Sequence, residues 1–380
     1  MKVLTIDDQQ LILLSVERRL KELGYTVAIA NTGEKGIELF NSFKPDLVLV
    51  DINLPDMSGL DVVKHIKSYK ELAVPVMIMS GNTQEDIIIS GFTLGIDDYM
   101  KKPISLDEMS ARVKRIIGVP KTENSNQKIQ PDSRILQKNC VGVVIPCYNE
   151  EERLLSEEFK NFAHKNLGYH LCFVNDGSTD NTLEVLKKLE QESDNNISVY
   201  NCEKNGGKAE AVRQGMLHLA KDKQLDCIGF LDADLSTDFR DFDDLVETLD
   251  QSDFKIVSGS RMSRMGANIT KESARKIISM TINLIIRTIL KMPFNDTQCG
   301  AKVMESSLVP TLFEKPFITR WLFDVEIFMR MRKHYGKKIA KEMICEQPLK
   351  RWIHADGSKL SMKDSVKIVG QLAKIAISYR

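Results

Sequence analysis

Acidic residues stand at the ends of predicted strands in both halves of the sequence, accompanied by a few hydroxyl and amino groups. The first group is Asp7, Asp8, Asp51, Ser80 and Lys102, and the second is Asp176, Asp232 and Asp234. The first combination is suited to accepting a phosphoryl group, and the second to holding a metal ion and the diphosphate of a sugar nucleotide. A chain with both sites predicts an enzyme joined to its own switch.

The first group has the charges that a phosphoryl-accepting site needs. Asp7 and Asp8 follow the first predicted strand, and Asp51 ends the third. Three carboxylates at neighbouring strand ends repel one another unless a cation joins them, so this pattern predicts bound Mg²⁺. Ser80 ends the fourth strand and Lys102 follows the fifth. A hydroxyl and an ammonium group are the partners that a phosphoryl group on Asp51 would need.

Residues 1–118 alternate short apolar strands with amphipathic helices, which predicts a doubly wound parallel sheet. The predicted strands are Lys2–Ile6, Thr26–Ala30, Leu47–Asp51, Val76–Ser80 and Asp98–Met100, with helices such as Gln9–Leu23 and Glu34–Phe43 between them. Ligands of such sheets bind at the carboxyl ends of the strands, which is where the first acidic group lies.

A polar stretch separates the two halves. Residues 119–135 lose the periodicity and are rich in Pro, Asn, Gln, Ser and charge, so we expect a linker over 119–138 with the composition of a flexible tether. Such a tether favours regulation by docking or dimerisation. The strand and helix rhythm then restarts, which predicts a second domain over 139–362. Its expected strands are Val141–Pro146, His170–Asn175, Ile197–Asn201 and Asp226–Asp232.

Four motifs surround the second acidic group: VVIPCYNEEE at 143–152, VNDGSTDNT at 174–182, NGGKAEAVRQGM at 205–216 and FLDADLST at 230–237. The Gly-rich turn before Lys208 suits close approach by a nucleotide phosphate. Asp232 and Asp234 would face opposite ways in an extended chain, so both can bind one metal only if the strand breaks there. Asp-x-Asp alone is a weak signal, and its position after the other three motifs makes the combination specific.

The composition is that of an ordinary globular protein, with 42% hydrophobic and 28% charged residues. The net charge of zero gives no reason to expect nucleic acid as a partner. The seven cysteines show no metal-ligand spacing and predict reduced thiols in a cytoplasmic protein. No apolar run reaches the ~18 residues of a membrane span. Ile277–Leu290 is predicted as a helix that either packs in the core or lies in a membrane interface.

Residues 1–118 resemble response-regulator receiver domains through DINLPDMSG around Asp51 and DDYMKKP around Lys102. The resemblance implies that Asp51 is phosphorylated, with a histidine kinase or another phosphodonor as partner. The implied Mg²⁺ ligands and phosphoryl contacts are Asp7, Asp8, Asp51, Asn53 (through its backbone carbonyl), Ser80 and Lys102. Tyr99 matches the aromatic residue that changes rotamer on activation, and a half-buried packing role explains it equally well.

Residues 139–362 resemble inverting family 2 glycosyltransferases. DTQCGAKVM, RWLFDVEIF and GSKL are similar to the β-glucosyl branch of the dolichyl (polyprenyl) phosphate glycosyltransferases more than to the mannosyl branch. The resemblance implies a nucleotide sugar as donor, a polyprenyl phosphate as acceptor, and Mg²⁺ or Mn²⁺ as cofactor. The expected fold class is therefore α/β throughout, with a flavodoxin-like receiver domain followed by a GT-A (Rossmann-like) domain.

The implied donor site draws on all four motifs and one later cation: Pro146, Tyr148, Glu150, Asp176, Lys208, Asp232, Asp234 and Arg351. Asp232 and Asp234 would hold the metal and the diphosphate, which also makes Asp234 a catalytic residue. The mannosyl enzymes supply a further ligand at the position where this chain has Ser236.

The implied acceptor site consists of Arg261, Arg275 and Ser279, which match positions that bind the acceptor phosphate in the mannosyl-phosphate branch. Arg275 and Ser279 are four residues apart and therefore share one face of a helix. A phosphate is already anionic at neutral pH and needs no strong general base.

A sugar hydroxyl acceptor would need a base. Asp324 and Glu326 are the candidates, and the alternative is that they are structural carboxylates paired with Arg320 or Arg330.

Together these patterns predict a phosphorylation-regulated inverting glycosyltransferase that moves a hexose from UDP-glucose or GDP-mannose to a polyprenyl phosphate at the cytoplasmic membrane face. Two alternatives stay open: a saccharide hydroxyl as acceptor, and a signalling adaptor whose transferase-like module is inactive. The amphipathic helix expected over 363–380 either contacts the inner face of the membrane peripherally or packs as a terminal helix. A dimer is compatible with either.

Overall fold

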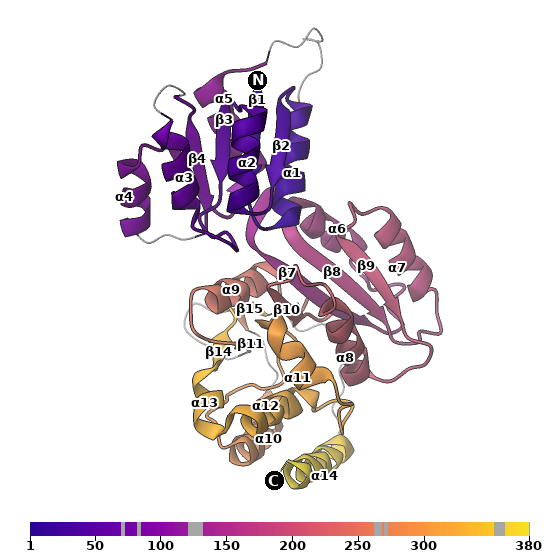
Figure 1. Cartoon of the computed structure of the whole chain (residues 1–380). Helices are drawn as coiled ribbons and strands as arrows, with labels where there is room; N and C mark the ends of the chain where they lie inside the picture. The colour runs from indigo at the N-terminus through magenta and orange to yellow at the C-terminus, as the bar shows by residue number, and fades with distance from the viewer. Residues whose placement is uncertain are drawn as a thin grey trace. The chain divides into compact units, whose positions relative to one another are not determined.

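The computed structural model describes residues 1–69, 73–81, 85–120, 132–261, 268–269, 273–352 and 362–379; of these, the side chains of 268–269, 273–281, 352 and 362–367 are left aside. The described chain forms two compact units (Figure 1). Unit 1 comprises Met1–Cys140 and His164–Tyr169, and unit 2 comprises Val141–Ala163 and His170–Arg380.

Unit 1 is built around a parallel five-stranded sheet in the order β2-β1-β3-β4-β5, as the sequence predicts. Its strands are β1 (Lys2–Ile6), β2 (Thr26–Ala30), β3 (Leu47–Val50), β4 (Val76–Ser80) and β5 (Asp98–Lys101). Its helices are α1 (Gln10–Glu22), α2 (Gly33–Phe43), α3 (Gly59–Ser68), α4 (Glu85–Thr93) and α5 (Leu106–Ile117). The chain order and short connections place the strand ends that carry the first acidic group along one edge.

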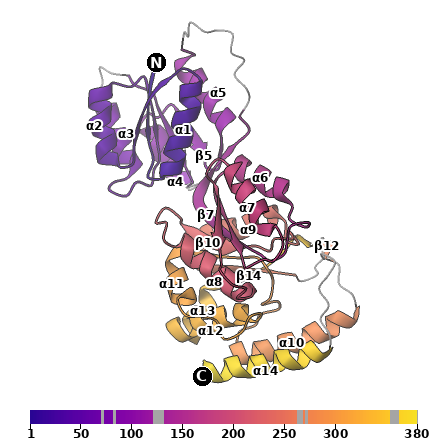
Figure 2. The same cartoon turned by 90° about the vertical axis from the view of Figure 1, so that its right-hand side faces the viewer.

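Successive strand residues alternate between two apolar cores because side chains of a strand point to opposite faces. Val3 packs with residues of α1 and α5 such as Val16 and Met109. Leu4 packs on the other face with residues of α2 and α3 such as Phe40 and Val62. Helices therefore cover both faces of this sheet (Figures 1 and 2).

Unit 1 also contains the start of a strand that the sequence assigned to the linker. The strand β7 (Ile135–Cys147) begins six residues before the predicted Val141, so residues 135–138 of the expected linker are strand in the structure. The short strand β6 (Ile104–Ser105) pairs antiparallel with it, Ile104 opposite Leu136. Leu136 is fully buried. Together with Leu167 it belongs to the core on the face of the sheet that α1 and α5 cover. Residues 121–131 of the expected linker lie outside the described residues.

Unit 2 contains a mixed sheet in the order β14-β11-β13-β10-β7-β8-β9. Most of its strands are parallel, whereas β13 runs antiparallel to both β10 and β11. The strands are β7, β8 (Asn166–Asn175), β9 (Ile197–Asn201), β10 (Cys227–Phe230), β11 (Ile256–Ser260), β13 (Lys302–Glu305) and β14 (Ile344–Pro348), with a separate pair β12 (Asn268–Ile269) and β15 (Arg351–Trp352).

The helices of unit 2 are α6 (Ser156–Lys165), α7 (Thr182–Gln191), α8 (Lys208–Leu219), α9 (Phe239–Asp250), α10 (Ser273–Leu290), α11 (Val309–Phe313), α12 (Phe323–Tyr335), α13 (Lys337–Glu342) and α14 (Met362–Ser378), with a 3-10 turn at Ser306–Leu308. Most of them separate successive strands of the sheet. The predicted break after β10 is present, since this strand ends at Phe230, two residues before Asp232.

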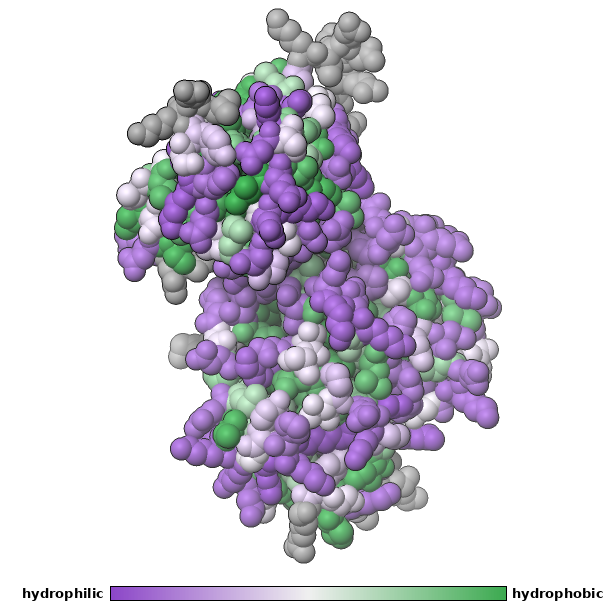
Figure 3. All heavy atoms as spheres, in the orientation of Figure 1, coloured by the Kyte–Doolittle hydropathy of each residue, from purple (hydrophilic) through white to green (hydrophobic). Residues whose placement is uncertain are grey.

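The helices α10 and α14 contact each other and lie side by side in Figure 2. Ile282, Ile286 and Leu290 of α10 are buried, as are Leu372 and Ile375 of α14. Other apolar side chains of the two helices, Leu284, Val369 and Ile377, are 46–72% exposed. Figure 3 shows hydrophobic surface at the end of unit 2 that carries these helices. The described helices include none that is long and apolar enough to cross a membrane.

Candidate functional site

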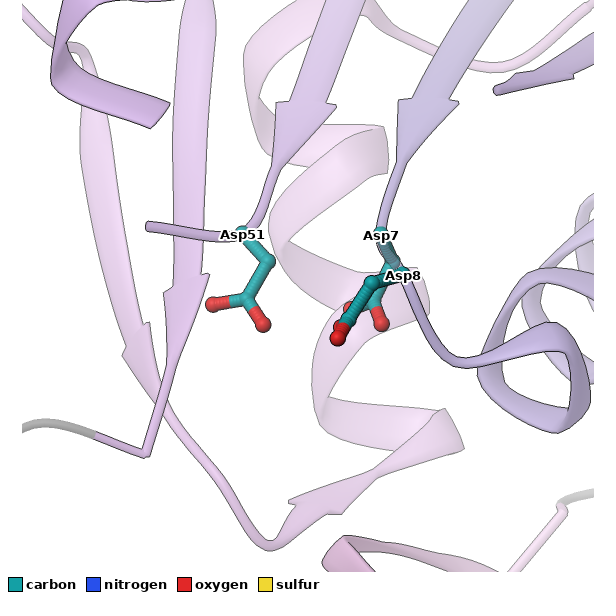
Figure 4. A group of neighbouring side chains, drawn as sticks. All are labelled: Asp7, Asp8 and Asp51. Carbon is teal, nitrogen blue, oxygen red and sulfur yellow. The ribbon is translucent and has the colours of Figure 1, made fainter. Parts of the chain in front are cut away.

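Three acidic side chains converge at the carboxyl edge of the unit 1 sheet (Figure 4). Asp7, Asp8 and Asp51 each offer a carboxylate oxygen, and these oxygens all lie within 4.8 Å of one another. Asp7 is fully buried and Asp51 is 5% exposed, whereas Asp8 is exposed. The pKa of Asp7 is raised to about 6, chiefly by burial and also by the nearby charge of Asp51, against the opposing effect of Lys102. Burial and Asp51 also raise the pKa of Asp8.

Lys102 supplies the compensating positive charge. Its Nζ atom lies 2.6 Å from Oδ2 of Asp7 and 3.0 Å from Oδ2 of Asp51, and the side chain is almost completely buried. Burial lowers the pKa of Lys102, but Asp7 and Asp51 raise it by more, so the ammonium group stays charged. Three carboxylates and one ammonium leave an excess of negative charge on oxygen ligands, which fits a hard divalent cation such as Mg²⁺.

The backbone around Asp51 is shaped by glycine. A Cβ atom at Gly59 would stand 2.0 Å from the carbonyl oxygen of Asp51, so a larger residue cannot fit there. The loop between them closes through a bridge of Asn53 with Ser58. Asn53 is thus held two residues after Asp51, at the position expected for a backbone ligand.

Ser80 is the last residue of β4, and Tyr99 lies within the neighbouring strand β5. Ser80 is fully buried, and Tyr99 is half-buried and forms a hydrogen bond with Ser80. Burial raises the pKa of Tyr99, while this hydrogen bond lowers it. The structure therefore brings together the five residues of the first predicted group and adds Tyr99 to their surroundings.

In unit 2, Asp176 follows β8 and receives two backbone hydrogen bonds. Gly206 N donates to its Oδ1 and Gly207 N donates to its Oδ2, both at 2.8 Å. Burial raises the pKa of Asp176 and these two donors lower it. The carboxylate thereby fixes the Gly-rich turn that opens α8, where Gly207 has a φ of 85°. This turn is the element that the sequence predicts to approach a nucleotide phosphate.

The PCYNE loop after β7 is interlocked with the loop that follows Asp176. Asn149 adopts a left-handed φ of 53°, and its side-chain oxygen accepts a hydrogen bond from Thr179 N at 2.9 Å. Glu150 N donates to Thr182 Oγ1 at 2.8 Å. Tyr148, at the tip of the loop, is 45% exposed and Pro146 is partly buried. The loop therefore presents Tyr148 on a fixed backbone.

Asp232 and Asp234 lie beyond the end of β10, where Leu235 turns the chain with a φ of 50°. Asp232 forms a salt bridge with Lys208, the first residue of α8. Burial lowers the pKa of Lys208, and Asp232 raises it by more. Burial raises the pKa of Glu150, and the charges of Asp234 and Asp232 raise it as well, so all three carboxylates belong to one acidic region. Two aspartates just beyond the end of a strand fit a divalent metal that is bound both by these carboxylates and by a diphosphate.

Two buried carboxylates of α12 occupy the candidate base positions. Asp324 Oδ1 lies 2.6 Å from Nζ of the fully buried Lys302, which also donates to the Cys299 carbonyl. Burial raises the pKa of Asp324, and Lys302 lowers it. Glu326 is fully buried and accepts hydrogen bonds from Ile318 N, Thr319 N and Thr319 Oγ1 at 2.9–3.1 Å.

These contacts favour a structural role for both side chains, and Asp324 has a different partner from the one expected. Asp324 pairs with Lys302 and not with Arg320. Glu326 forms the expected salt bridge with Arg330, at 4.0 Å, and also accepts hydrogen bonds from the backbone of Ile318 and Thr319.

The predicted acceptor residues are only partly described. Arg261 follows β11 and forms a two-point pair with Asp296, with Nε–Oδ2 at 2.7 Å and Nη2–Oδ1 at 2.8 Å. Burial lowers the pKa of Arg261, and Asp296 raises it by more; Asp232 acts in the same direction. Arg275 and Ser279 both lie on α10, as predicted, and their side chains are outside the described residues.

Arg351, the last predicted donor-site cation, lies in β15. Its backbone N–H donates to the buried Asp241 at 3.1 Å, and its Nε lies 3.9 Å from the same carboxylate. Asp241 therefore holds both ends of this residue.

Sequence reasoning did not single out Gly300 or Asp296. A Cβ atom at Gly300 would stand 2.0 Å from Asp232 Oδ2, so the DTQCGAK segment packs directly against Asp232. Asp296, in the same segment, holds Arg261. In the sequence this segment serves only as a marker of the family. The signal available for a role in the site was that it contains both an acidic residue and a glycine.

Comparisons with known proteins match each unit to a different family. The response regulator receiver domain family matches residues 3–114, and glycosyl transferase family 2 matches residues 142–312. A dolichyl-phosphate beta-glucosyltransferase of Trichomonas vaginalis is 32% identical over 274 residues, which cover 68% of this chain and 79% of that protein. One of Dictyostelium discoideum is 28% identical over 254 residues, covering 63% of this chain and 74% of that protein.

The receiver part has relatives of its own. The cell cycle transcriptional regulator CtrA of Caulobacter vibrioides is 40% identical over 117 residues, covering 31% of this chain and 50% of that protein. This chain therefore spans only half the length of that regulator, and the matched half corresponds to unit 1.

Proposed function

The chain belongs to glycosyl transferase family 2 and carries a response regulator receiver domain ahead of its transferase domain, and from this premise we propose that it moves a hexose from a nucleotide sugar to a polyprenyl phosphate, with inversion. The observation that carries the proposal is the 32% identity to a dolichyl-phosphate beta-glucosyltransferase over four-fifths of that relative. UDP-glucose is the favoured donor on the same ground, with GDP-mannose as the second candidate.

The reaction joins two phosphate-bearing substrates. An oxygen of the acceptor phosphate forms a bond to the anomeric carbon while the bond from that carbon to the nucleoside diphosphate breaks, which inverts the configuration. Asp232 and Asp234 would hold the metal that neutralises the departing diphosphate. Lys208 adds a charged ammonium group on the same side. Asp176, Tyr148, Pro146 and Glu150 would orient the nucleoside on the two interlocked loops, and Arg351 would meet the diphosphate.

A phosphate acceptor agrees with the state of the candidate bases. Glu326 has no exposed surface, and its carboxylate oxygens already accept hydrogen bonds from the backbone. Asp324 is paired with the buried Lys302. A sugar hydroxyl would need one of these groups to take a proton, whereas an anionic phosphate does not. The saccharide-acceptor alternative and the inactive-module alternative are therefore less well supported.

Arg261 is the proposed contact to the acceptor phosphate, together with Arg275 and Ser279 of α10. Its fork is oriented by Asp296, so the guanidinium plane is fixed before any ligand binds. The exposed residues Leu284, Val369 and Ile377 of α10 and α14 support contact of this end of unit 2 with the cytoplasmic face of a membrane, where a polyprenyl phosphate would reside.

The enzyme assay is a panel of radiolabelled nucleotide sugars with polyprenyl phosphate and Mg²⁺ or Mn²⁺, in which product is extracted into organic solvent. Label from one nucleotide sugar should enter the organic phase only when lipid phosphate and metal are present. Label that moves instead to a water-soluble saccharide would favour the alternative acceptor. No transfer or hydrolysis with any donor would favour the inactive module.

Phosphorylation of Asp51 by a histidine kinase or another phosphodonor is the proposed regulatory input, with Mg²⁺ at Asp7, Asp8 and Asp51. A contact within unit 1 supports a route for this signal: Gln9 Nε2 donates to the carbonyl of Lys138 in β7 at 2.8 Å, and Gln9 N donates to Asp7 Oδ1 at 3.0 Å. The strand β7 continues without interruption to Cys147, next to Tyr148. Typical allosteric coupling of about 1–3 kcal/mol would change the rate several-fold to about 100-fold.

The regulatory assay compares transfer rates with and without acetyl phosphate, for the wild type and Asp51→Asn. The wild-type rate should change and the variant rate should not. Equal rates under all conditions would reject regulation by phosphorylation and leave the transferase activity as a separate question.

A further inference from the structure

The segment between α11 and α12 is irregular yet firmly held. Thr319 in this segment is buried, and its N–H and hydroxyl group both contact Glu326, at 3.0 and 3.1 Å. The same hydroxyl oxygen accepts a hydrogen bond from Leu322 N at 3.2 Å. Tyr379, after α14, donates to Glu326 from the other side at 3.2 Å. The buried Glu326 carboxylate therefore fixes the backbone before Arg320, and the Thr319 hydroxyl fixes the backbone after Trp321, although the Arg320 and Trp321 side chains are exposed.

The exposed Arg320 lies against the Gly-rich turn of the donor site. Its backbone carbonyl accepts a hydrogen bond from Ala209 N, in the first turn of α8, at 3.3 Å. Its side chain passes over Gly207, where a Cβ atom would stand 3.2 Å from Cδ of Arg320. The guanidinium charge also reaches Asp176, since it lowers the pKa of this carboxyl group against the larger effect of burial. Two independent contacts thus fix the backbone at Arg320: the hydrogen bond of Thr319 N to Glu326, and that of Ala209 N in α8 to the carbonyl of Arg320.

The other cations around this site already have carboxylate partners. Lys208 pairs with Asp232, Arg261 with Asp296 and Lys302 with Asp324. Among the residues that the structure describes, Arg320 has no carboxylate within salt-bridge distance. An exposed guanidinium group on a firmly held backbone, beside a glycine turn and a helix N-terminus, is placed to bind an oxyanion in two-point fashion.

We propose that Arg320 binds a phosphate group of the nucleotide sugar, and that Glu326 is the positioning residue that holds Arg320 over the Gly206–Gly207 turn. The donor is favoured over the acceptor because the anchors of Arg320 lie at α8 and near Asp176, on the side assigned to the nucleotide. This inference rests on the proposed function, and it adds a donor residue that none of the four sequence motifs around the acidic group contains. It also gives the buried Glu326 a role other than that of a base.

The test measures binding of UDP, with Mn²⁺, to the full chain by calorimetry, and then the KM values for UDP-glucose and polyprenyl phosphate. Arg320→Ala should weaken UDP binding by about 10- to 100-fold, since a hydrogen bond to a charged group is lost, and Arg320→Lys should lose less. The KM for the nucleotide sugar should rise while the KM for the lipid phosphate stays the same. Arg18→Ala, which removes an exposed arginine of α1 in unit 1, is the matched control and should change neither value.

Glu326→Gln and the milder Thr319→Val test the positioning role. Both should raise the KM for the nucleotide sugar as Arg320→Ala does, and neither should add to it in the double variant, because they act through the same guanidinium. If Glu326→Gln fails to fold, Thr319→Val carries this part of the test. Additive effects would overturn the positioning role.

The possible outcomes separate this inference from the proposed function. If the wild type and Arg320→Ala bind UDP equally well, the inference is overturned and the proposed function is not. A rise in the KM for polyprenyl phosphate with unchanged UDP binding assigns the phosphate to the acceptor and overturns the donor assignment. Wild-type protein that binds no nucleotide with either metal overturns the proposed function, and the inference with it.

Discussion

Gly300 touches Asp232 so closely that a Cβ atom at position 300 would stand 2.0 Å from the carboxylate oxygen Oδ2. The loop that carries Gly300 is held at its other end by Lys302, through the buried pair with Asp324. The position of Asp232 is therefore set from two sides, by Lys208 of α8 and by the backbone of this loop.

Replacement of Gly300 by alanine should impair transfer without unfolding the protein. The added methyl group must displace Asp232, and displacement of a catalytic group by about 1 Å can lower a rate by roughly 100-fold. The rate is measured by the solvent-extraction assay, and stability by thermal unfolding. Gly370→Ala makes the same chemical change where nothing lies within 4 Å, and it should leave the rate unchanged. A Gly300→Ala variant with the full rate would show that Asp232 needs no fixed position.

Removal of the metal-binding carboxylates should abolish transfer. Asp234→Ala deletes one of the two proposed ligands, and a chelator should have the same effect on the wild type, because the diphosphate would leave without charge neutralisation. Metal titration of the wild type should restore the rate after chelation. Asp253→Ala, at an exposed position beyond α9, is the control and should behave like the wild type. Activity that persists in a chelator would contradict metal dependence.

The contact of Gln9 with β7 should matter for regulation and not for phosphorylation itself. Gln9→Ala removes the side-chain hydrogen bond to Lys138 and keeps the backbone bond to Asp7. We expect acetyl phosphate to label the variant at the wild-type rate, while the difference in transfer rate between labelled and unlabelled protein becomes smaller. Gln10→Ala, at the start of α1, is the neighbouring control. Normal regulation in Gln9→Ala would exclude this contact as part of the route.

Leu136 should stabilise unit 1, although it lies within the predicted linker. It has no exposed surface and packs with Val3, Ile104 and Met109. Leu136→Ala should lower the free energy of unfolding by about 2–5 kcal/mol, which is the usual range for a buried leucine. Denaturant unfolding followed by circular dichroism measures this loss. Leu155→Ala, where the side chain is 48% exposed, should change stability little. Equal stabilities would indicate that Leu136 is exposed in solution.

The sequence predicted the elements of unit 1 well because apolar alternation and turn residues are local signals. The strands Lys2–Ile6, Thr26–Ala30 and Val76–Ser80 are confirmed residue for residue. The prediction that acidic residues gather at one edge of this sheet followed directly, because the carboxyl ends of parallel strands lie at the same edge. The sequence predicts Lys102 as a partner of a phosphoryl group on Asp51, and in the structure its ammonium group pairs with both Asp7 and Asp51.

The start of β7 was missed because its residues alternate weakly: Gln137, Lys138 and Asn139 are polar, and only Leu136 before them is fully buried. What makes this stretch a strand is its partner β6, whose residues Ile104 and Ser105 pair with Leu136 and Ile135 across about 30 residues of sequence. The partners of Arg261 and Lys302, which are Asp296 and Asp324, were missed for the same reason. Each is a long-range pairing that depends on how the loops cross at the end of the sheet.

The strand β7 also limits how this gene can be divided. A fragment that ends at residue 118, where the receiver resemblance ends, would lack Leu136 and Leu167 and would leave the apolar side chains that they cover open to water. We expect such a fragment to aggregate or to recruit another chain. Any exchange of receiver domains between relatives, in the laboratory or in evolution, would have to carry residues 132–140 along or supply a substitute for them.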